Sequence, residues 1–219
     1  MRWVPDNRWL AEDAYIIGGG PSLATFDWSL LHPKNTIGCN SAFALGPAVC
    51  RVCYFGDEKF FRERDPETRR MFSDGLREYS EAGGLVVTDH PHAYFAGHPW
   101  VRWLPRQPRG LGTAAIGFNT NSGSAAINLA LLLGAARVFL LGFDMQLGAA
   151  GTANFHKKSI EPPDARVYGK MLAAMQLVAQ QLPVVFPGRE VINVNDGGRL
   201  ACFPRVGVAE HFSAQGAMV

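Results

Sequence analysis

The sequence has few charged residues, and their signs nearly cancel. Charged residues make up 18% of the 219-residue chain, and 21 Lys and Arg against 19 Asp and Glu leave a formal net charge of +2. Globular proteins usually carry about 25% charged residues. Because 47% of the chain is hydrophobic, the low charge does not indicate disorder. The small net charge argues against nucleic acid or an anionic membrane surface as a partner.

Long apolar runs and cysteines are also scarce. The longest apolar stretch without charge, residues 122–136, is shorter than the roughly 20 residues that span a bilayer, so we expect a buried helix there and no integral membrane span. Four cysteines are too few for a disulfide scaffold. The first residues are polar and interrupted by Pro5, which is unlike a signal peptide. We therefore expect a cytoplasmic protein with reduced thiols.

Short apolar runs alternate with helical patterns along the chain. Helical spacing predicts helices over residues 67–82, from an N-cap at Ser122 to a stop at Gly134, and between Pro163 and Pro183. Six nearly continuous apolar runs are typical of strands buried on both faces: residues 14–17, 35–38, 52–55, 85–88, 138–141 and 190–193. This alternation predicts an α/β, Rossmann-like single domain over residues 1–219, a mostly parallel sheet with helices on both faces.

Two long segments fit none of these elements. Residues 89–121 are rich in Pro, Gly, His and Arg, and residues 145–163 form a Gly- and Ala-rich loop. Structureless loops of this length in a compact domain are usually functional. We expect both segments to cover an edge of the sheet, with residues 145–163 as the lid loop.

A glycine-rich segment follows the first predicted strand: Gly18, Gly19 and Gly20, then Pro21 and Ser22. Glycines let backbone amides approach a phosphate closely, and a following helix start adds a positive dipole end. The segment lacks the last glycine of the dinucleotide-binding fingerprint and the lysine of a P-loop. A phosphate-binding loop and a tight structural turn both remain open.

Polar residues follow three of the predicted strands. Asn40, Asp57 and Asp144 each come just beyond an apolar run. Open α/β folds bind ligands at the carboxyl ends of their parallel strands. Any one of these residues alone is explained by a loop or a helix cap, but the three together favour a binding site.

Two further positions are candidates for chemistry. Ser122 and Gly123 open the charge-free helix, where a hydroxyl and free amides would hold a carboxylate or phosphate, or where Ser122 simply caps the helix. His156, followed by Lys157 and Lys158 in the lid, suits a general base whose anionic partner arrives with the ligand. The alternative is a surface histidine.

Other constellations carry less weight. The spacing of Cys50 and Cys53 has no second pair, so a zinc site is not expected. His90, His92 and His98 lie in a segment of loop composition and are interpreted as a surface cluster without a metal.

In this order, the segments resemble two related families, the bacterial lipooligosaccharide sialyltransferases and the 6-hydroxymethylpterin diphosphokinase-like proteins. The chain also resembles proteins encoded by phages and prophages, which share its Gly-Phe-Asp-Met and Phe-Pro-Arg stretches. The resemblance runs from Ala14 to about Phe212 and rests on these motifs: residues 16–23, 38–40, 121–123, 140–144 and 191–200.

The sialyltransferase resemblance implies a Rossmann-like domain with a lid that binds a cytidine nucleotide sugar and needs no cofactor. It implies that His156 deprotonates the acceptor hydroxyl and that Asp144 meets the ribose or base. It also suggests a homo-oligomer. The remaining ligand contacts that it implies are those of Gly19, Gly20, Ser22, Asn40, Ser122 and Gly123.

The chain also departs from the sialyltransferases. They carry tyrosines just past the position of Asp144, where Met145 follows here, and asparagine at the position of Asp57. The diphosphokinase-like proteins share Asp57, which with Asp144 would hold Mg²⁺ against a triphosphate. The prediction is nucleotide-dependent group transfer, foremost glycosyl transfer to an unknown acceptor. The alternatives are Mg²⁺-dependent diphosphate transfer from ATP to a pterin-like alcohol and a phage-type binding or assembly protein without turnover.

Overall fold

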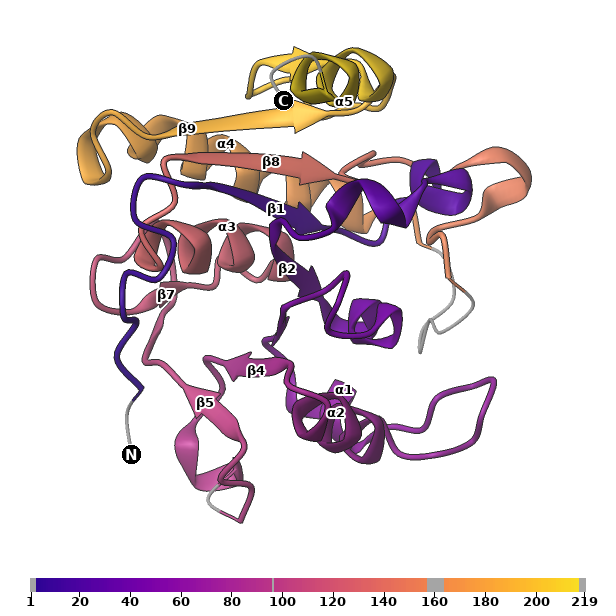
Figure 1. Cartoon of the computed structure of the whole chain (residues 1–219), viewed down its shortest axis with the longest axis vertical. Coiled ribbons are helices and arrows are strands. Elements are labelled where there is room, and N and C mark those ends of the chain that lie inside the picture. Colours follow the sequence, from indigo (N-terminus) through magenta and orange to yellow (C-terminus); the bar gives the residue numbers. More distant parts are fainter. Residues whose placement is uncertain (1–2, 96, 157–163, 217–219) are drawn as a thin grey trace.

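The computed structural model describes residues 3–95, 97–156 and 164–216. Its main feature is an eight-stranded parallel sheet with the strand order β10-β9-β8-β1-β2-β3-β4-β5 (Figure 1). All six predicted strands are present. The strands of this sheet are β1 (Asp13–Ile17), β2 (Asn35–Cys39), β3 (Val52–Phe55), β4 (Leu85–Thr88), β5 (Val101–Trp103), β8 (Arg137–Leu141), β9 (Glu190–Val194) and β10 (Arg205–Val206).

The sheet is buried on both faces, which explains the continuous apolar runs of its strands. Successive side chains of β1 belong to different cores: Ile16 packs with one hydrophobic cluster and Tyr15 and Ile17 with the other. Leu140 and Leu141 of β8 divide in the same way.

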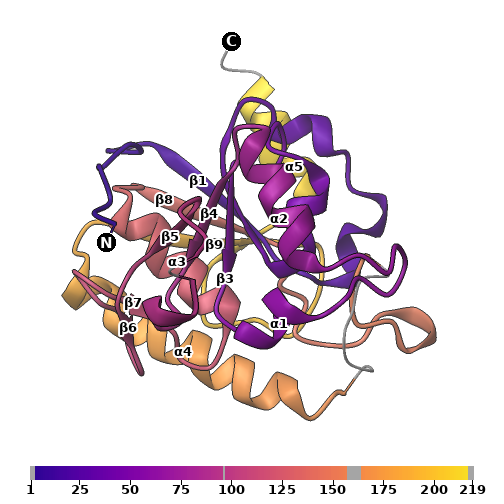
Figure 2. The same cartoon turned by 90° about the horizontal axis from the view of Figure 1, so that it is seen from below.

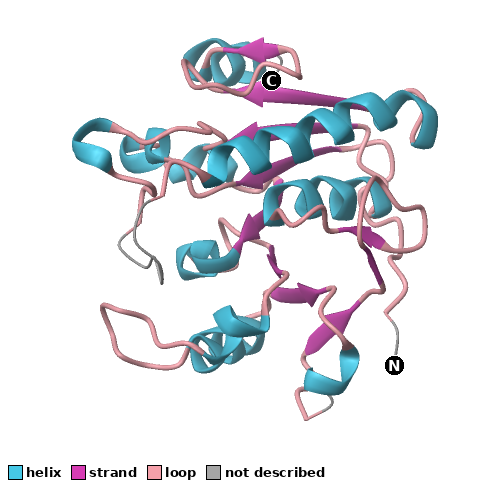
Figure 3. Ribbon diagram, turned by 180° about the vertical axis from the view of Figure 1, so that it is seen from behind, coloured by secondary structure: helices cyan, strands magenta, loops and turns pink. Residues whose placement is uncertain are grey.

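Helices cover the two faces of the sheet. The α3 and α4 helices contribute to one core, while α1, α2, α5 and the 3-10 turns η1, η2 and η3 contribute to the other (Figures 2 and 3). No helix of the described residues has both the length and the apolar character needed to cross a membrane. The bounds are α1 (Glu58–Arg62), α2 (Phe72–Glu81), α3 (Ser122–Leu132), α4 (Val167–Val185), α5 (Val208–Gly216), η1 (Pro21–Thr25), η2 (Trp28–Leu31) and η3 (Asn40–Leu45).

The chain changes direction across the sheet next to β1. From β1 it passes to β2, β3, β4 and β5 on one side, and after α3 it returns to β8 on the other side of β1. The register pairs Ile17 at the end of β1 with Gly38 of β2 and with Leu141 of β8. The carboxyl ends of β1 and β8 therefore form the topological switch point at which open α/β sheets bind ligands.

Local side-chain hydrogen bonds move the helix ends away from the predicted positions. The α2 helix begins at Phe72, because Asp65 Oδ1 accepts from the amides of Glu67 and Thr68 and closes a turn. Asn121, not Ser122, caps α3: its Oδ1 accepts from the amides of Gly123 and Ser124 at 2.8 and 3.3 Å.

The α4 helix also extends further than predicted. It continues past Pro183 to Val185. A proline so close to the end of a helix removes one backbone hydrogen bond and leaves only a short stretch of helix beyond it.

The segment 89–121 is not a structureless lid, which corrects the prediction. It contributes the edge strand β5, the 3-10 turn η4 (His92–Phe95), and a separate parallel pair of β6 (Arg106–Gln107) with β7 (Ile116–Gly117). The buried side chain of Asn128 in α3 holds this segment, because its Oδ1 accepts from the amides of Gly112 and Gly117 at 2.8 and 2.7 Å. A side chain outside the segment thus adds to the backbone pairing that makes the segment regular.

Candidate functional site

The glycine loop after β1 packs tightly against the chain that follows β8. The amide of Gly18 donates to the carbonyl of Leu141 at 2.8 Å, and that of Gly20 to the carbonyl of Gly142 at 2.9 Å. A Cβ on Gly18 would lie 2.7 Å from the Gly142 carbonyl oxygen, and a Cβ on Gly20 would overlap the carboxylate of Asp144. These glycines are therefore required by the close approach of two backbones.

Most amides of this loop are already committed. Those of Gly18 and Gly20 bind carbonyls, and the amide of Ser22 donates to Asp144 Oδ2 at 3.2 Å. Among the three glycines, only Gly19 keeps an amide without an acceptor in the described residues. The tight-turn interpretation thus accounts for Gly18 and Gly20, and the loop offers a phosphate one amide rather than a cradle.

Asp144 joins the ends of three strands. Its side chain is buried, with the residue 6% exposed. Its Oδ2 accepts from the Ser22 hydroxyl at 3.0 Å as well as from the Ser22 amide, and its Oδ1 accepts from Asn195 Nδ2 at 2.9 Å. Asn195 directly follows β9, as Asn40 directly follows β2. The same sequence signal, a polar residue just after a strand, therefore marks Asn195, but the sequence-based prediction missed it. This network places Asp144 at the site but leaves its carboxylate with three donors already bound.

Asn40 lies at the end of β2 with an unused acceptor. Its backbone has a φ of 52°, a left-handed conformation that asparagine tolerates better than most non-glycine residues. Its Oδ1 is buried and has no hydrogen-bond partner among the residues that the structure describes. Because a buried acceptor without a donor is costly, a ligand or an ordered water is expected to fill it.

The start of α3 lies close to the end of β2 and to the glycine loop. Cys39 Sγ contacts the carbonyl of Ser122 at 3.6 Å. The ring of Phe143 separates α3 from the glycine loop, since a Cβ on Gly18 or Gly123 would lie 3.1 or 2.6 Å from it. The Gly123 amide is bound by its cap, whereas the half-exposed Ser122 hydroxyl makes no hydrogen bond to the described residues.

The described part of the lid, residues 145–156, packs on the glycine loop. The amide of Phe155 donates to the carbonyl of Gly19 at 2.9 Å, and its ring lies 5.3 Å from that of Trp28. His156 follows with its ring 4.9 Å from that of Phe155. The structure thus places Phe155, the residue before His156, on the glycine loop, while Lys157, Lys158 and the rest of the predicted lid to residue 163 lie outside the described residues.

Asp57 is not brought together with Asp144. Asp57 is exposed and caps α1 by accepting from the Lys59 amide at 2.8 Å. Its strand β3 is three places from β8 in the sheet, so the two strand ends lie about 14 Å apart. Mg²⁺ binds oxygen at about 2 Å, so one ion does not join these carboxylates. The described residues contain no cluster of three acidic, His or Cys side chains suited to a metal.

A second polar cluster lies at the carboxyl ends of β3 and β4. Asp89, which follows β4, is buried and accepts from Arg106 Nε at 3.1 Å and Nη2 at 2.9 Å. Burial raises the pKa of Asp89, and Arg106 opposes that shift. Asp89 carries the same signal as Asp57, a polar residue directly after a strand, and was missed. Arg106 carried no such signal, because its position depends on the β6–β7 pair.

His90 belongs to this cluster and is not a surface residue, which corrects the prediction. Its side chain is 18% exposed and lies 4.0 Å from the Glu58 carboxylate through Nε2. The ring packs against Tyr94 with centroids 4.7 Å apart, and its Nδ1 is buried without a partner. Burial, with Arg106 nearby, lowers the pKa of His90, so the ring is neutral at pH 7.

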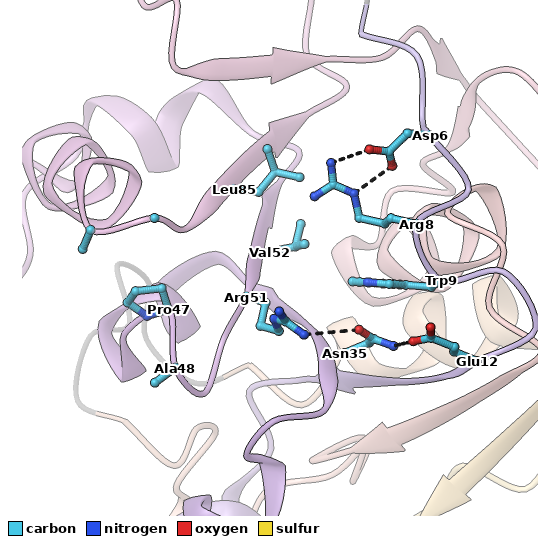
Figure 4. A pocket seen from close by; sticks show the side chains of 12 residues that line it. Asp6, Arg8, Trp9, Glu12, Asn35, Pro47, Ala48, Arg51, Val52 and Leu85 are labelled. Atoms are coloured by element: carbon cyan, nitrogen blue, oxygen red, sulfur yellow. Dashed lines mark hydrogen bonds and ion pairs between the residues drawn. The ribbon is translucent and has the colours of Figure 1, made fainter.

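A cavity of about 760 Å³ lies at the opposite edge of the sheet, at the amino ends of β2, β3 and β4 (Figure 4). Arg8 in this cavity binds Asp6 at 2.7 Å, and Asn35 donates to Glu12 at 2.6 Å. Arg51 also lines it. None of its lining side chains has a buried polar atom without a partner, in contrast to Asn40 and His90 at the carboxyl edge.

The sequence matches no protein-family model and no curated protein. Solved structures do share its fold. The sialyltransferase CstII from Campylobacter jejuni, solved with cytidine-5'-monophosphate, aligns with a TM-score of 0.53 and 12% identity over 89% of this chain and 84% of that chain. The monofunctional α-2,3-sialyltransferase Cst-I from the same organism aligns with a TM-score of 0.55 and 14% identity, covering 89% and 80%.

A third structure shares the fold over part of its length. The MAf glycosyltransferase from Magnetospirillum magneticum AMB-1 aligns with a TM-score of 0.57 and 12% identity over 95% of this chain. This chain spans 37% of that protein, little more than a third. These likenesses establish the parallel α/β, Rossmann-like fold.

Proposed function

We propose that the protein is a glycosyltransferase that moves a sugar from a nucleotide sugar to an acceptor hydroxyl. The observation that carries the proposal is the buried Oδ1 of Asn40, which has no donor and lies beside the switch point of the sheet. A nucleotide supplies N–H and O–H donors for such an acceptor. The fold shared with CstII, whose structure contains cytidine-5'-monophosphate, and with MAf supports this function.

The nucleotide would lie across the ends of β1 and β2. Its base or ribose would donate to Asn40 Oδ1, and its phosphate would meet the hydroxyl of Ser122 and the amide of Gly19, which has no acceptor in the described residues. The positive end of the α3 dipole favours a negative charge at this place. Asp144 would act as a positioning residue, because it holds Ser22 and Asn195 rather than facing the ligand with a free carboxylate.

His156 would act as the general base of a single displacement. As the acceptor oxygen attacks the sugar carbon, His156 takes the hydroxyl proton, and the bond from that carbon to the phosphate oxygen breaks with its electron pair leaving on the nucleotide. This step uses no metal ion. The lid would bring the base to the acceptor, since Phe155 next to His156 is already bonded to Gly19.

A nucleotide panel with and without magnesium tests the function. We expect CMP, UDP or their sugars to raise the melting temperature of the protein without metal, because a ligand that binds only the folded state stabilises it. Stabilisation by ATP with Mg²⁺ alone would replace this proposal by diphosphate transfer. No shift with any nucleotide would leave a binding or assembly protein without turnover.

A further inference from the structure

Arg106 has one amino group left over after its contacts within the protein. Its Nε and Nη2 donate to the two oxygens of Asp89, and Nη2 also donates to the carbonyl of Gly56. Its Nη1 makes no hydrogen bond to the described residues and is not among the buried atoms without partners. Because 29% of the side chain is exposed, Nη1 is within reach of a ligand.

The guanidinium is held in one orientation. The side chain of Asp89 is fully buried beneath it, and its carbon Cζ lies 3.8 Å from the centre of the Phe118 ring. The guanidinium is already fixed by Asp89 and by the Phe118 ring, so it loses little conformational entropy when its remaining N–H groups bind an acceptor.

The backbone between Phe118 and α3 supports a functional role. Asn119 and Thr120 have φ angles of 51° and 53°, two successive left-handed conformations in residues other than glycine. Such strain gathers at ligand-binding sites. Arg106 itself lies at the same carboxyl edge as Asn40 and Ser122, because it bonds Asp89 after β4 and the carbonyl of Gly56 after β3.

The surrounding charges leave Nη1 without a counterpart. Glu58 is paired with Arg62 at 2.7 Å, and Asp57 caps α1. Burial and the Asp89 carboxylate raise the pKa of Tyr54, so its hydroxyl keeps its proton. That hydroxyl lies near Asp89. The cluster thus holds one donor, on Arg106, that lacks an acceptor among the described residues.

We propose that Arg106 Nη1 binds an oxyanion of the substrate, either the phosphate of the nucleotide or a carboxylate on the sugar or acceptor. The inference rests on the proposed function, because it assigns the oxyanion to that substrate. A hydrogen bond between an arginine and an anionic oxygen is charge-assisted and stronger than a neutral one.

Binding of matched charged and neutral probes tests this inference. Isothermal titration would compare CMP with cytidine and glucuronate with glucose. The double variant Asp89→Asn with Arg106→Gln removes the guanidinium without leaving a buried charge unpaired. We expect it to lose about 10- to 100-fold in affinity for one charged probe and nothing for its neutral counterpart. Loss for CMP identifies a phosphate, and loss for glucuronate a carboxylate.

Two further variants complete the test. Arg109→Gln, at an exposed arginine of the same segment, should bind every probe as the wild type does. If the double variant does not fold, Arg106→Lys decides. A lysine that keeps Asp89 paired offers no fixed second donor, so affinity for one of the two charged probes should fall while affinity for its neutral counterpart is unchanged.

The inference is overturned if the variant that folds keeps its affinity for both charged probes. It is also overturned if the wild type binds neither charged probe more tightly than the matching neutral probe. The proposed function fails separately, when the wild type binds no nucleotide and no nucleoside but glucuronate binding still depends on Arg106.

Discussion

At the scale of single residues, Gly20 is required by the close approach of neighbouring atoms and not by a backbone conformation that other residues cannot adopt. Its φ is −59°, which alanine also adopts. A Cβ there would overlap the Asp144 carboxylate and the Gly142 carbonyl. The residue is therefore glycine because of what lies against it, and the cost of any side chain is steric.

Gly20→Ala is expected to lower the free energy of unfolding by about 1–3 kcal/mol or more, the cost of overpacking a tight interior. Urea denaturation measures it. The control is Gly169→Ala in α4, where a Cβ meets nothing and the change should stabilise by up to about 1 kcal/mol. Equal stability of the two variants would contradict this account of the glycine loop.

His156 carries the second prediction at this scale. His156→Ala should lose turnover of a nucleotide sugar and keep nucleotide affinity, because the base acts on the acceptor while the nucleotide binds at Asn40 and Gly19. General-base catalysis contributes about 100- to 10,000-fold. Initial rates and titration of the same preparation separate the two effects. Unchanged turnover would remove His156 from this role.

At the scale of elements, α5 is attached to the sheet through a buried histidine. His211 is 8% exposed, and its Nε2 lies 3.0 Å from the Tyr15 hydroxyl. The ring centroid is 4.4 Å from that of Phe139. Burial lowers the pKa of His211, and Lys34 and Arg137 also lower it while Asp13 raises it. The helix is therefore docked by the neutral form of this ring.

Stability should consequently fall in mild acid. The unfolded chain gains a proton at the usual histidine pKa of about 6.5, whereas folded His211 gains it only at a lower pH. The contribution of His211 to the free energy of unfolding is therefore constant above the unfolded pKa. It falls as the pH drops from the unfolded pKa towards the lower folded pKa. Urea midpoints at pH 7.5 and 5.5 should differ less in His211→Gln than in the wild type. His90, whose pKa is also lowered, leaves a residual difference.

The control for this measurement is His32→Gln, at an exposed histidine. It should show the same difference between the two pH values as the wild type. A full acid response retained in His211→Gln would show that α5 is not docked through this ring.

The elements also show what the sequence predicts and where it stops. Strands such as β1 and β8 were predictable because their burial on both faces produces continuous apolar runs. The starts of α2 and α3 depend on single side chains: Asp65 closes a turn before α2, and Asn121 caps α3. The segment 89–121 is held in part by Asn128 of α3 and by Gln181 of α4, contacts that no local pattern contains.

Some residues of the candidate site were likewise predictable from the sequence and others were not. Asn40 was predictable from its place after a strand, because all parallel strands end at one edge. The unused acceptor on its side chain was not predictable, since it depends on the burial around it. Asp144 and Ser22 were both predicted as site residues, but their hydrogen bond to each other was not, and Asn195, the other partner of Asp144, was missed. Arg106 was missed because it reaches the edge from a segment that the pattern left without structure.

At the scale of the whole molecule, the sheet has two edges with different character. The carboxyl edge holds buried polar atoms without partners at Asn40 and His90. The amino edge holds a cavity of about 760 Å³, whose Arg8 and Asn35 are paired with Asp6 and Glu12. The unsatisfied hydrogen-bonding capacity favours the carboxyl edge as the binding site. The topology agrees, because the switch point lies between the carboxyl ends of β1 and β8.

One matched pair of substitutions decides between the edges. Asn40→Ala removes the unused acceptor at the carboxyl edge, and Arg51→Ala removes an exposed cation that lines the amino-edge cavity. We expect Asn40→Ala to lose most of the rise in melting temperature that the best nucleotide of the panel causes, since a lost buried hydrogen bond costs about 1 kcal/mol or more. Arg51→Ala should retain that rise in full. The opposite result would indicate that the nucleotide binds in the cavity of Figure 4. The glycine loop, the α3 helix and the lid would then have no part in binding it.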